Sequence, residues 1–283
     1  MSRIAYVNGQ YVPHRKASVH IEDRGYQFSD GIYEVCEVLD GRLIDVPGHL
    51  DRLERSAREL DLGLPLGRAV LEMVMAEVCR RNRIKDGILY LQVTRGVAPR
   101  DHPFPKNGTR PALVMTAKSI PRLRESEKAE RGVGVITLPD NRWERVDIKT
   151  VSLLPNVLAK QKARESGAYE AWFVDDEGFV TEGSSTNAWI VTQEGVIVTR
   201  QATRGILRGI TRDTAIRAAQ DLQYKIEERR FTVEEALQAR EAFITAASTL
   251  VMPVVTIDGN PIGDAQPGEI SRRLRAHYHD YAA

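Results

Sequence analysis

Lys149 is the residue whose type and surroundings most directly suggest covalent chemistry. It lies in RVDIKTVSLLPNVLAKQKA, after the apolar Ile148 at the end of a predicted strand and before Thr150 and Val151. A lysine at the end of a strand is usually solvated. In a partly apolar pocket, however, the amine loses its charge more easily and becomes a nucleophile that forms imines with carbonyl compounds.

Glu182 is a carboxylate with a second possible chemical role. It lies in FVTEGSSTN, directly after a predicted strand and inside a Gly-Ser-Ser turn. Alone, this pattern indicates only a carboxylate in a turn. Beside a pyridine nitrogen, a carboxylate would keep that nitrogen protonated, and a protonated pyridine ring accepts electrons from a carbanion at a substrate α-carbon.

Two further segments could bind a phosphate. GILRGITRD (residues 205–213) begins a helix after a glycine, and the backbone N–H groups of Gly209, Ile210 and Thr211 would form an anion-binding cup at its positive end. Arg52, in HLDRL, stands beside the apolar stripe of its helix. It is either a surface residue or a charge-assisted, bidentate partner of the same phosphate.

The first part of the chain is predicted to be rich in strands. Asn8-Gly9 and Asp40-Gly41 are two-residue turn signals between strand-like runs, and leucine and alanine spacing indicates two amphipathic helices. The predicted elements are the hairpins 4–13 and 31–46, helices 48–60 and 68–82, and strands 88–96 and 111–118. Alternation along 31–39 places Tyr33 and Glu37 on one face and Glu34 on the other. Two helices with several strands indicate an α+β unit.

A charged segment from Ile120 to Arg131 contains Pro121 and is interpreted as a linker. It divides the chain into an N-terminal α/β domain (1–120) and a C-terminal domain (121–283). The second part is predicted to contain a strand at 132–139, a helix at 155–166 closed by Gly167, a hairpin at 169–183, strands at 187–192 and 195–200, a helix at 211–223 and a C-terminal helix.

Composition excludes several classes of protein. The 283 residues include 40 basic and 39 acidic side chains, and this balance gives no reason to expect a nucleic-acid partner. The two cysteines have no metal-ligand spacing, so we expect no metal. No apolar run approaches the roughly 20 residues that cross a bilayer, and the first residues do not resemble a signal peptide. We therefore expect a cytoplasmic protein that does not act at a membrane.

Six stretches, in the same order, resemble one known family. They are EDRGYQFSDGIYEV, HLDRL, YLQVTRGVAPRDH, RWERVDIKTVSLLPNVLAKQKA, YEA…VTEGSSTN and LRGITRD. Together they resemble the fold-type IV pyridoxal-phosphate-dependent aminotransferases, and within them the D-amino acid (D-alanine) aminotransferases. The resemblance implies a smaller N-terminal α/β domain, a larger C-terminal domain with a barrel-like sheet, and a pyridoxal 5'-phosphate cofactor.

The resemblance also implies a role for each matching residue. Lys149 corresponds to the lysine that holds the cofactor as a Schiff base and acts as the catalytic base, and Glu182 to the partner of the pyridine nitrogen. The implied phosphate ligands are Arg52, Ile210 and Thr211, with Ser248 as a further candidate in TAAST, where the family tends to offer more hydroxyls. Tyr33 corresponds to the tyrosine that lines the site and contacts substrate.

Arg100 and His102, in T-R-G-x-x-x-R-x-H, decide the subclass. They correspond to the pair that holds the substrate carboxylate, which in this family comes from the partner of a homodimer. The implied reaction is transamination between a D-amino acid and a 2-oxo acid such as 2-oxoglutarate. Three alternatives remain: an aminodeoxychorismate lyase, a branched-chain or (R)-amine aminotransferase, and a cofactor-binding protein without turnover. Glu37 stands where a lysine would be expected, and we expect it to alter side-chain preference.

Overall fold

The computed structural model describes residues 3–106, 108–120 and 126–282. The chain forms two compact units. Unit 1 comprises residues 1–122 together with 148–152, and unit 2 comprises residues 123–147 and 153–283. The domain boundary expected between residues 120 and 121 lies next to residues 121–125, which are outside the described part. Arg131, expected in a linker, instead ends the short helix α4 (Glu127–Arg131).

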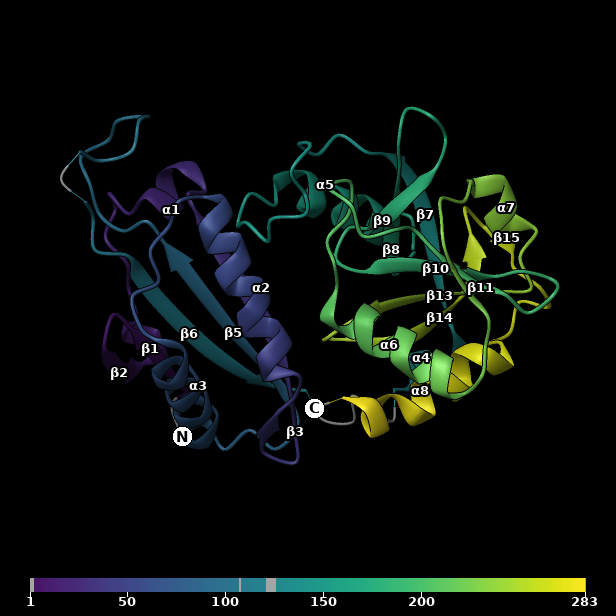
Figure 1. The fold of residues 1–283 in the computed structure, drawn as a ribbon, viewed down its shortest axis with the longest axis horizontal. Helices are drawn as coiled ribbons and strands as arrows, with labels where there is room; N and C mark the ends of the chain where they lie inside the picture. The colour runs from purple at the N-terminus through teal and green to yellow at the C-terminus, as the bar shows by residue number, and fades with distance from the viewer. Residues whose placement is uncertain (1–2, 107, 121–125, 283) are drawn as a thin grey trace. The chain divides into compact units, whose positions relative to one another are not determined.

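Unit 1 is a six-stranded sheet in the order β2-β1-β6-β5-β3-β4 (Figure 1). Its strands are β1 (Ile4–Val7), β2 (Gln10–Pro13), β3 (Gly31–Leu39), β4 (Arg42–Leu43), β5 (Gly87–Thr94) and β6 (Ala112–Ser119). Both predicted hairpins are present. Asn8 and Asp40 adopt positive φ at the turns, which is why Asn-Gly and Asp-Gly are favoured there.

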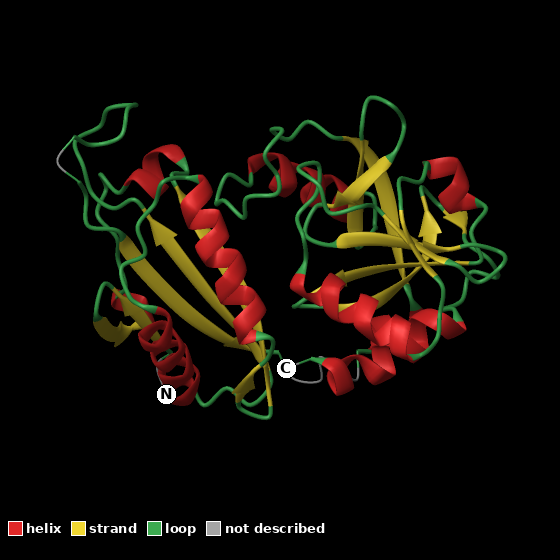
Figure 2. Ribbon diagram, viewed as in Figure 1, coloured by secondary structure: helices red, strands yellow, loops and turns green. Residues whose placement is uncertain are grey.

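Two long helices cover this sheet, α2 (Val46–Glu59) and α3 (Arg68–Asn82) (Figure 2). Their buried residues, with alternate residues of the strands, form one apolar core that includes Ile32, Leu53, Leu71 and Met115. A short helix that the sequence analysis did not predict, α1 (Arg24–Phe28), precedes β3, and the carboxylate of Asp23 caps it by accepting the Gly25 N–H at 2.9 Å. Unit 1 also contains the 3-10 turn η1 (His14–Lys16).

Unit 2 is built on a nine-stranded sheet in the order β12-β11-β10-β13-β14-β7-β8-β9, with β15 beside β14. The strands are β7 (Val133–Pro139), β8 (Glu170–Val174), β9 (Val180–Gly183), β10 (Asn187–Val191), β11 (Ile197–Thr199), β12 (Ile226–Glu228), β13 (Glu241–Ala246), β14 (Leu250–Ile257) and β15 (Asn260–Pro261). Side chains from both ends of this order share one core, among them Trp172 of β8 and Val198 of β11. The sheet therefore curves around its own interior, as the predicted barrel-like sheet requires.

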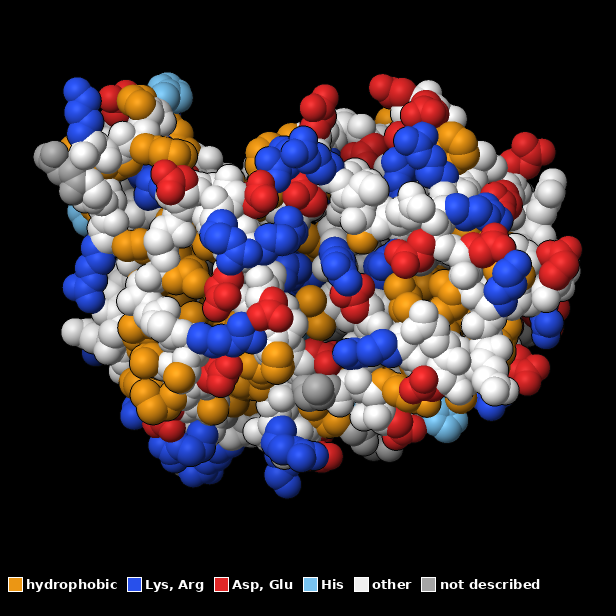
Figure 3. All heavy atoms as spheres, in the orientation of Figure 1, with side chains coloured by type: hydrophobic (Ala, Val, Ile, Leu, Met, Phe, Trp, Pro, Cys, Tyr) orange, Lys and Arg blue, Asp and Glu red, His pale blue; other side chains and the backbone are white. Residues whose placement is uncertain are grey.

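Helices pack on the outside of this curved sheet. The helices α6 (Ile210–Asp221) and α8 (Glu269–Tyr281) share a cluster with Trp189 and Phe243, and α5 (Leu154–Glu165) packs on Phe173. The short helix α7 (Val233–Leu237) begins at Thr232, whose side chain caps it. On the face of the molecule in Figure 3, basic and acidic side chains are interspersed over most of the surface.

The segment around Lys149 differs from the expectation in two respects. It was expected in the C-terminal domain, but residues 148–152 belong to unit 1. Ile148 was expected to end a strand, but the segment forms only an isolated bridge between Thr150 and Ile32. Hydrogen bonds between residues distant in sequence hold the segment against β3: the Tyr33 N–H donates to the Lys149 carbonyl and the Val151 N–H to the Gly31 carbonyl, each at 3.0 Å.

Among the described residues, no helix is both long and apolar enough to cross a membrane.

Candidate active site

Lys149 lies beside the start of β3 in unit 1, half-buried. Ile148, 4% exposed, anchors the segment in the core of the unit, and the Lys149 N–H donates to the Ser56 hydroxyl at 3.3 Å. The Lys149 Nζ lies 4.3 Å from the centroid of the Tyr33 ring. Two residues that the sequence separates by more than a hundred positions therefore face each other.

Tyr33 belongs to a small aromatic and polar surface on β3 and β5. Its ring stacks on that of Tyr90, with centroids 5.7 Å apart, and Gln92 is its partner in the register of the two strands. The Tyr90 hydroxyl donates to Gln92 at 2.7 Å, and burial raises the pKa of Tyr90 to about 12, with a smaller effect from Tyr33. The Tyr90 hydroxyl is therefore protonated at neutral pH. Tyr33 is half-buried.

Arg52 is fixed by a buried carboxylate from the other face of β3. Its Nε and Nη2 donate to Glu34 Oε1 and Oε2 at 2.8 and 2.7 Å, and His49 Nδ1 lies 2.8 Å from Glu34 Oε2. Burial acts to raise the pKa of Glu34, but the charge and hydrogen bonds of Arg52, with those of His49, outweigh it and lower the pKa to about 2. Burial acts to lower the pKa of Arg52, and Glu34 raises it. Arg52 thus carries a permanent charge in a fixed direction.

Glu182 lies on β9 in unit 2, 4% exposed. Arg142 Nη1 donates to its Oε1 at 2.6 Å, while its Oε2 accepts from Asn187 Nδ2 and from the Leu207 N–H, each at 3.1 Å. Arg142 is held in turn by Asp140, with its Nη2 2.7 Å from Asp140 Oδ2. Burial acts to lower the pKa of Arg142, and the two carboxylates raise it. The arrangement fixes Glu182 as an oriented anion.

The residues that hold Glu182 also shape the beginning of α6. Asn187 donates to the Leu207 carbonyl at 2.9 Å, and its Oδ1 would be 2.2 Å from a Cβ on Gly209, so only glycine fits at this N-cap. In the part of the chain that the structure describes, no side chain caps α6. The first N–H groups of the helix, including those of Ile210 and Thr211, are thus available to an anion.

The turn that follows Glu182 is tied to a fully buried carboxylate, Glu170. The Ser184 hydroxyl donates to Glu170 Oε1, and the Ser185 hydroxyl donates to Oε2 at 2.7 Å. Lys160 Nζ lies 3.2 Å from the same Oε2. These contacts hold the Gly-Ser-Ser turn in one shape beside Glu182.

Ser248 lies, exposed, in the turn between β13 and β14. It comes three residues after Thr245, whose register partner across the sheet is Asn187. The end of β13 and the start of β10 are therefore neighbours, and Ser248 follows directly from that end. Unit 2 thus places Glu182, the beginning of α6 and the Ser248 turn on connected elements.

Arg100 and His102 are both exposed, in the loop between β5 and β6 of unit 1. Arg100 lies over the Phe28 ring, with its guanidinium carbon 4.9 Å from the centroid, and the His102 ring is 5.5 Å from the same ring. One aromatic side chain of α1 therefore supports both members of the R-x-H pair. Glu37, by contrast, is buried, at 3% exposed.

Several residues that hold the candidate site residues in place were missed by the sequence analysis. Glu34 had a detectable signal, because it is a carboxylate on a strand face otherwise occupied by Ile32, Cys36 and Val38. Arg142 had none, since it stands among other charged residues in DNRWERVD. Asn187 was included in the stretch VTEGSSTN, but its contacts with Glu182 and Leu207 could not be predicted without the fold.

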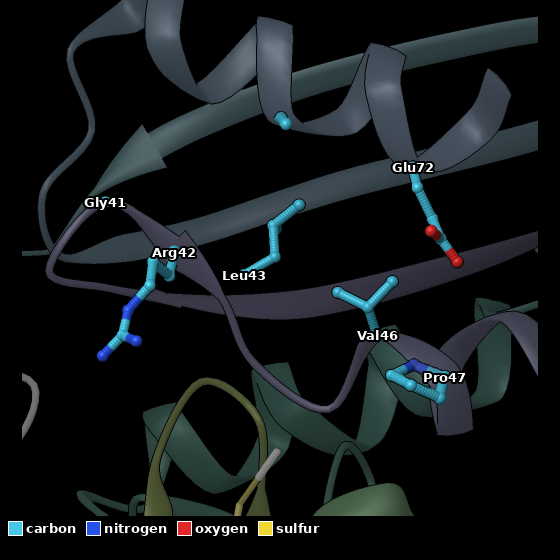
Figure 4. A pocket seen from close by; sticks show the side chains of 7 residues that line it. Gly41, Arg42, Leu43, Val46, Pro47 and Glu72 are labelled. Atoms are coloured by element: carbon cyan, nitrogen blue, oxygen red, sulfur yellow. The ribbon is translucent and has the colours of Figure 1, made fainter. Parts of the chain in front are cut away.

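Other features of the molecule do not coincide with these residues. A cavity of about 380 Å³ in unit 1 is lined by Gly41, Arg42, Leu43, Val46, Pro47, Glu72 and Ala76 (Figure 4). None of these residues was predicted to take part in a site. Across the described ranges, no group of three or more His, Cys, Asp or Glu side chains could hold a metal ion.

The donor set fits pyridoxal 5'-phosphate. The cofactor carries an aldehyde, a pyridine nitrogen and a phosphate, which an amine, a carboxylate and cationic or N–H donors can bind. Unit 1 supplies the half-buried amine of Lys149 and the fixed charge of Arg52. Unit 2 supplies the oriented carboxylate of Glu182 and the uncapped beginning of α6.

Comparisons with known proteins agree with this chemistry. Residues 31–257 match the family model described as amino-transferase class IV. The chain is 41% identical to a D-alanine aminotransferase of Bacillus licheniformis, over 95% of this chain and 93% of that protein, and 41% identical to one of Staphylococcus aureus (strain MSSA476), over 98% and 96%.

A solved structure of the branched-chain amino acid aminotransferase of T.th. with pyridoxamine 5'-phosphate is also similar. It matches with a TM-score of 0.90 and 28% identity, over 99% of this chain and 94% of that one. The predicted fold class is confirmed by this match. The chain belongs to the class IV aminotransferases, enzymes of fold type IV that use pyridoxal 5'-phosphate.

Proposed function

We propose that this enzyme transfers the amino group of a D-amino acid such as D-alanine to a 2-oxo acid such as 2-oxoglutarate. Two D-alanine aminotransferases share 41% of its residues over nearly the whole chain. The chain also carries T-R-G-x-x-x-R-x-H at residues 94–102. The observation that carries the proposal is the position of the Lys149 amine, 4.3 Å from the centroid of the Tyr33 ring, on a segment pinned to β3.

Four groups would hold the cofactor. Lys149 would bind its aldehyde carbon, Glu182 would bind the ring nitrogen, and Arg52 with the N–H groups of Ile210 and Thr211 would bind the phosphate, with Ser248 as a further ligand. When bound, pyridoxal 5'-phosphate supplies an electron-accepting ring for the electrons of the substrate α-carbon. Glu182 would keep that ring protonated, because the guanidinium of Arg142, the Asn187 amide and the Leu207 N–H hold its carboxylate in a fixed orientation.

Lys149 would also hold and move a proton. Its Nζ would accept the α-proton of the substrate as a general base and give the proton back as a general acid. Tyr33 lies against the same amine. Arg100 and His102 bind the substrate carboxylate by charge-assisted hydrogen bonds. With the carboxylate fixed, the configuration at the α-carbon decides whether its hydrogen faces Lys149.

The active enzyme is proposed to be a homodimer in which Arg100 and His102 serve the site of the partner. The loop that carries them and the α1 region paired with it have exposed apolar side chains: Ile21, Tyr26, Val97 and Phe104 are 76%, 75%, 44% and 54% exposed. On α5, Leu154, Val157 and Leu158 are more than half exposed at helical spacing. Such patches mark surfaces that another protein covers.

The decisive experiment is the half-reaction of the cofactor-loaded enzyme with D-alanine and, separately, with L-alanine. The visible absorbance of the cofactor is followed and pyruvate is measured. Bleaching with D-alanine alone, with pyruvate formed, is the expected result. Bleaching with L-alanine alone would transfer the assignment to the second candidate, a branched-chain L-aminotransferase, which the structural match favours.

A yellow protein that reacts with neither enantiomer would contradict the proposal in a different way. That result would favour the aminodeoxychorismate lyase and the (R)-amine aminotransferase as alternatives. Pyruvate released from aminodeoxychorismate without a 2-oxo acid acceptor would identify the lyase. Turnover of an (R)-amine that survives the loss of Arg100 would identify the amine enzyme.

A further inference from the structure

Arg24 is a nearly fully buried arginine, 3% exposed, that none of the roles above uses. It is the first residue of α1, and its guanidinium reaches the loop between β5 and β6. Its Nη1 donates to the Asp101 carbonyl at 2.6 Å, and its Nη2 donates to the His102 carbonyl at 3.1 Å. The two carbonyls belong to the R-x-H element itself, so one planar side chain fixes the backbone that carries Arg100 and His102.

Asp30 fixes Arg24 in turn. Its Oδ2 accepts from Arg24 Nε at 2.8 Å and from Arg95 Nε at 2.8 Å, and the side chains of Arg24, Asp30 and Arg95 are 4%, 11% and 10% exposed. A carboxylate shared by two buried guanidinium groups holds both in fixed orientations, because each ionic hydrogen bond is stronger away from water. The cluster of Arg24, Asp30 and Arg95 is thus rigid enough to position the loop.

Arg95 secures a second point of the same loop. Its Nη1 and Nη2 donate to the carbonyls of Asp61 and Leu60 at 2.9 and 2.8 Å, and its guanidinium carbon lies 3.6 Å from the centroid of the Phe104 ring. The segment just after Arg100 is therefore attached to one cluster at two points: at 101–102 through Arg24, and at Phe104 through Arg95.

The backbone around Arg24 is also paired with the beginning of the loop. The Arg24 N–H donates to the Gly96 carbonyl at 2.9 Å, and the Ala98 N–H to the Glu22 carbonyl at 3.3 Å. A Cβ on Gly25 would lie 2.2 Å from Thr94 Cγ2, so α1 can approach the end of β5 only with glycine there. The DRG sequence thus allows α1 to pack closely against the beginning of the loop.

We propose that Arg24, held by Asp30, is a positioning residue for the substrate carboxylate and acts through Arg100 and His102 without touching the substrate. This inference rests on the proposed function, because it takes the R-x-H pair as the carboxylate site. An exposed loop of prolines and polar residues would otherwise sample many conformations. Fixing it beforehand removes an ordering cost from substrate binding.

The test compares Arg24→Lys and Asp30→Asn with the wild-type enzyme loaded with cofactor. Lysine keeps the charge but cannot donate to two carbonyls and a carboxylate in one plane. Arg200→Lys is the matched control, because Arg200 is also buried, donates to Asp175 at 2.7 Å, and lies outside the proposed site. Steady-state KM and kcat for D-alanine are measured, together with hydrogen–deuterium exchange of residues 96–106.

Arg24→Lys and Asp30→Asn should raise KM for D-alanine by about 10- to 100-fold, with a smaller change in kcat, because the carboxylate contact is lost equally in ground and transition states. Exchange should accelerate within 96–106 and not across the rest of unit 1. In an Arg100→Ala background, Arg24→Lys should add little to KM, because the two substitutions remove one interaction. Arg200→Lys should leave KM unchanged.

Three results would overturn the proposal: an unchanged KM, a full additional KM effect in the Arg100→Ala background, or exchange accelerated throughout unit 1, which would make Arg24 a general stabiliser. Failure of the proposed function has a different signature. If Arg100→Ala itself leaves KM unchanged, the R-x-H pair does not bind the carboxylate. In that case, hydrogen–deuterium exchange of residues 96–106 in the Arg24→Lys variant decides by itself whether Arg24 orders the loop.

Discussion

Glu34 and Arg52 form a two-point ion pair in the interior of unit 1, with Nε–Oε1 and Nη2–Oε2 distances of 2.8 and 2.7 Å. Compared with apolar side chains of similar volume, a buried ion pair adds little net stability, but removing one partner is costly because the other remains charged. The pair gives Arg52, the proposed phosphate ligand, a fixed direction. Glu34 therefore supports both folding and the orientation of Arg52.

The acid stability of the enzyme should depend on Glu34. The pKa of Glu34 is lowered from 4.5 to about 2 in the folded state. A lowered pKa stabilises the folded protein above the unfolded-state pKa, and this contribution is lost as the pH falls from about 4.5 towards 2. The contribution is on the order of 3 kcal/mol, at about 1.4 kcal/mol for each pKa unit.

Glu34→Gln should remove most of this dependence and also weaken cofactor binding. Urea unfolding of wild type and variant is compared between about pH 2 and pH 7, the range over which the Glu34 contribution is lost. The variant should be less stable at neutral pH, and the two free energies of unfolding should converge in acid. Glu77→Gln is the control, because Glu77 also contacts two arginines but lies on the surface. Parallel curves for wild type and Glu34→Gln would contradict the assignment.

Lys149→Ala should abolish transamination and leave the fold intact. The Lys149 side chain contacts Tyr33, while its backbone holds the segment to β3 through the Tyr33 N–H. Alanine keeps those backbone bonds. Turnover with D-alanine should become undetectable, whereas circular dichroism and the thermal midpoint should stay close to those of the wild type. Near-normal turnover would refute the role of Lys149.

The strand and helix content of the fold could be predicted largely from sequence. The predicted helix 68–82 coincides with α3, because its apolar spacing is a local property. The position of Lys149 could not be predicted in the same way. Its segment joins unit 1 through hydrogen bonds to Gly31 and Tyr33, more than a hundred residues earlier, and nothing in DIKTV specifies that partner.

The charged partners of the site residues could likewise not be predicted from the sequence. Tyr33, Lys149 and Glu182 could be singled out by their motifs, but Arg142 and Arg24 act through contacts made by folding. Arg142 reaches Glu182 across forty residues, and Arg24 reaches His102 across seventy-eight. Long, flexible side chains make such contacts in directions that a linear pattern does not encode.

Glu182→Gln should reduce kcat strongly while preserving the structure. Glutamine can keep its oxygen towards the Asn187 amide and the Leu207 N–H, while Arg142 stays paired with Asp140. Its NH2 cannot accept from Arg142 Nη1, and the negative charge that Arg142 orients is lost. We expect a loss of roughly 100-fold or more in kcat with D-alanine, by analogy with the removal of one preorganised charge-stabilising group. Single-turnover kinetics locates the loss in the proton-transfer step. An unchanged rate would remove Glu182 from the mechanism.

Arg142→Met should act mainly on stability. It leaves two buried carboxylates, Asp140 and Glu182, without the cation that lies between them. Removing one member of a buried ionic group costs about 3–5 kcal/mol. Chemical denaturation at neutral pH should show this loss, and part of it should be recovered at lower pH, where the carboxylates can take up protons. Arg230→Met, which breaks an exposed pair with Glu177, should change stability by less than about 1 kcal/mol.

Mixing two defective variants, assayed at a D-alanine concentration well below the raised KM of Arg100→Ala, tests whether the R-x-H loop serves the partner subunit. Lys149→Ala and Arg100→Ala are co-expressed with different tags, and the hybrid is isolated. In a twofold dimer with a shared loop, the hybrid has one site with both defects and one site with neither. The isolated hybrid should therefore have about half of wild-type activity, since one of its two sites is intact, and the unseparated random mixture about a quarter.

The converse arrangement gives a different result. If Arg100 and Lys149 of the same chain served one site, every site in the hybrid would carry one defect and activity would stay at the level of the single variants. The control is Lys149→Ala mixed with Tyr33→Phe. Lys149 and Tyr33 contact each other within one chain, so their hybrid carries one defect in each site and no fully intact site. Recovery only in the Arg100 hybrid would show that each chain lends its loop to the other.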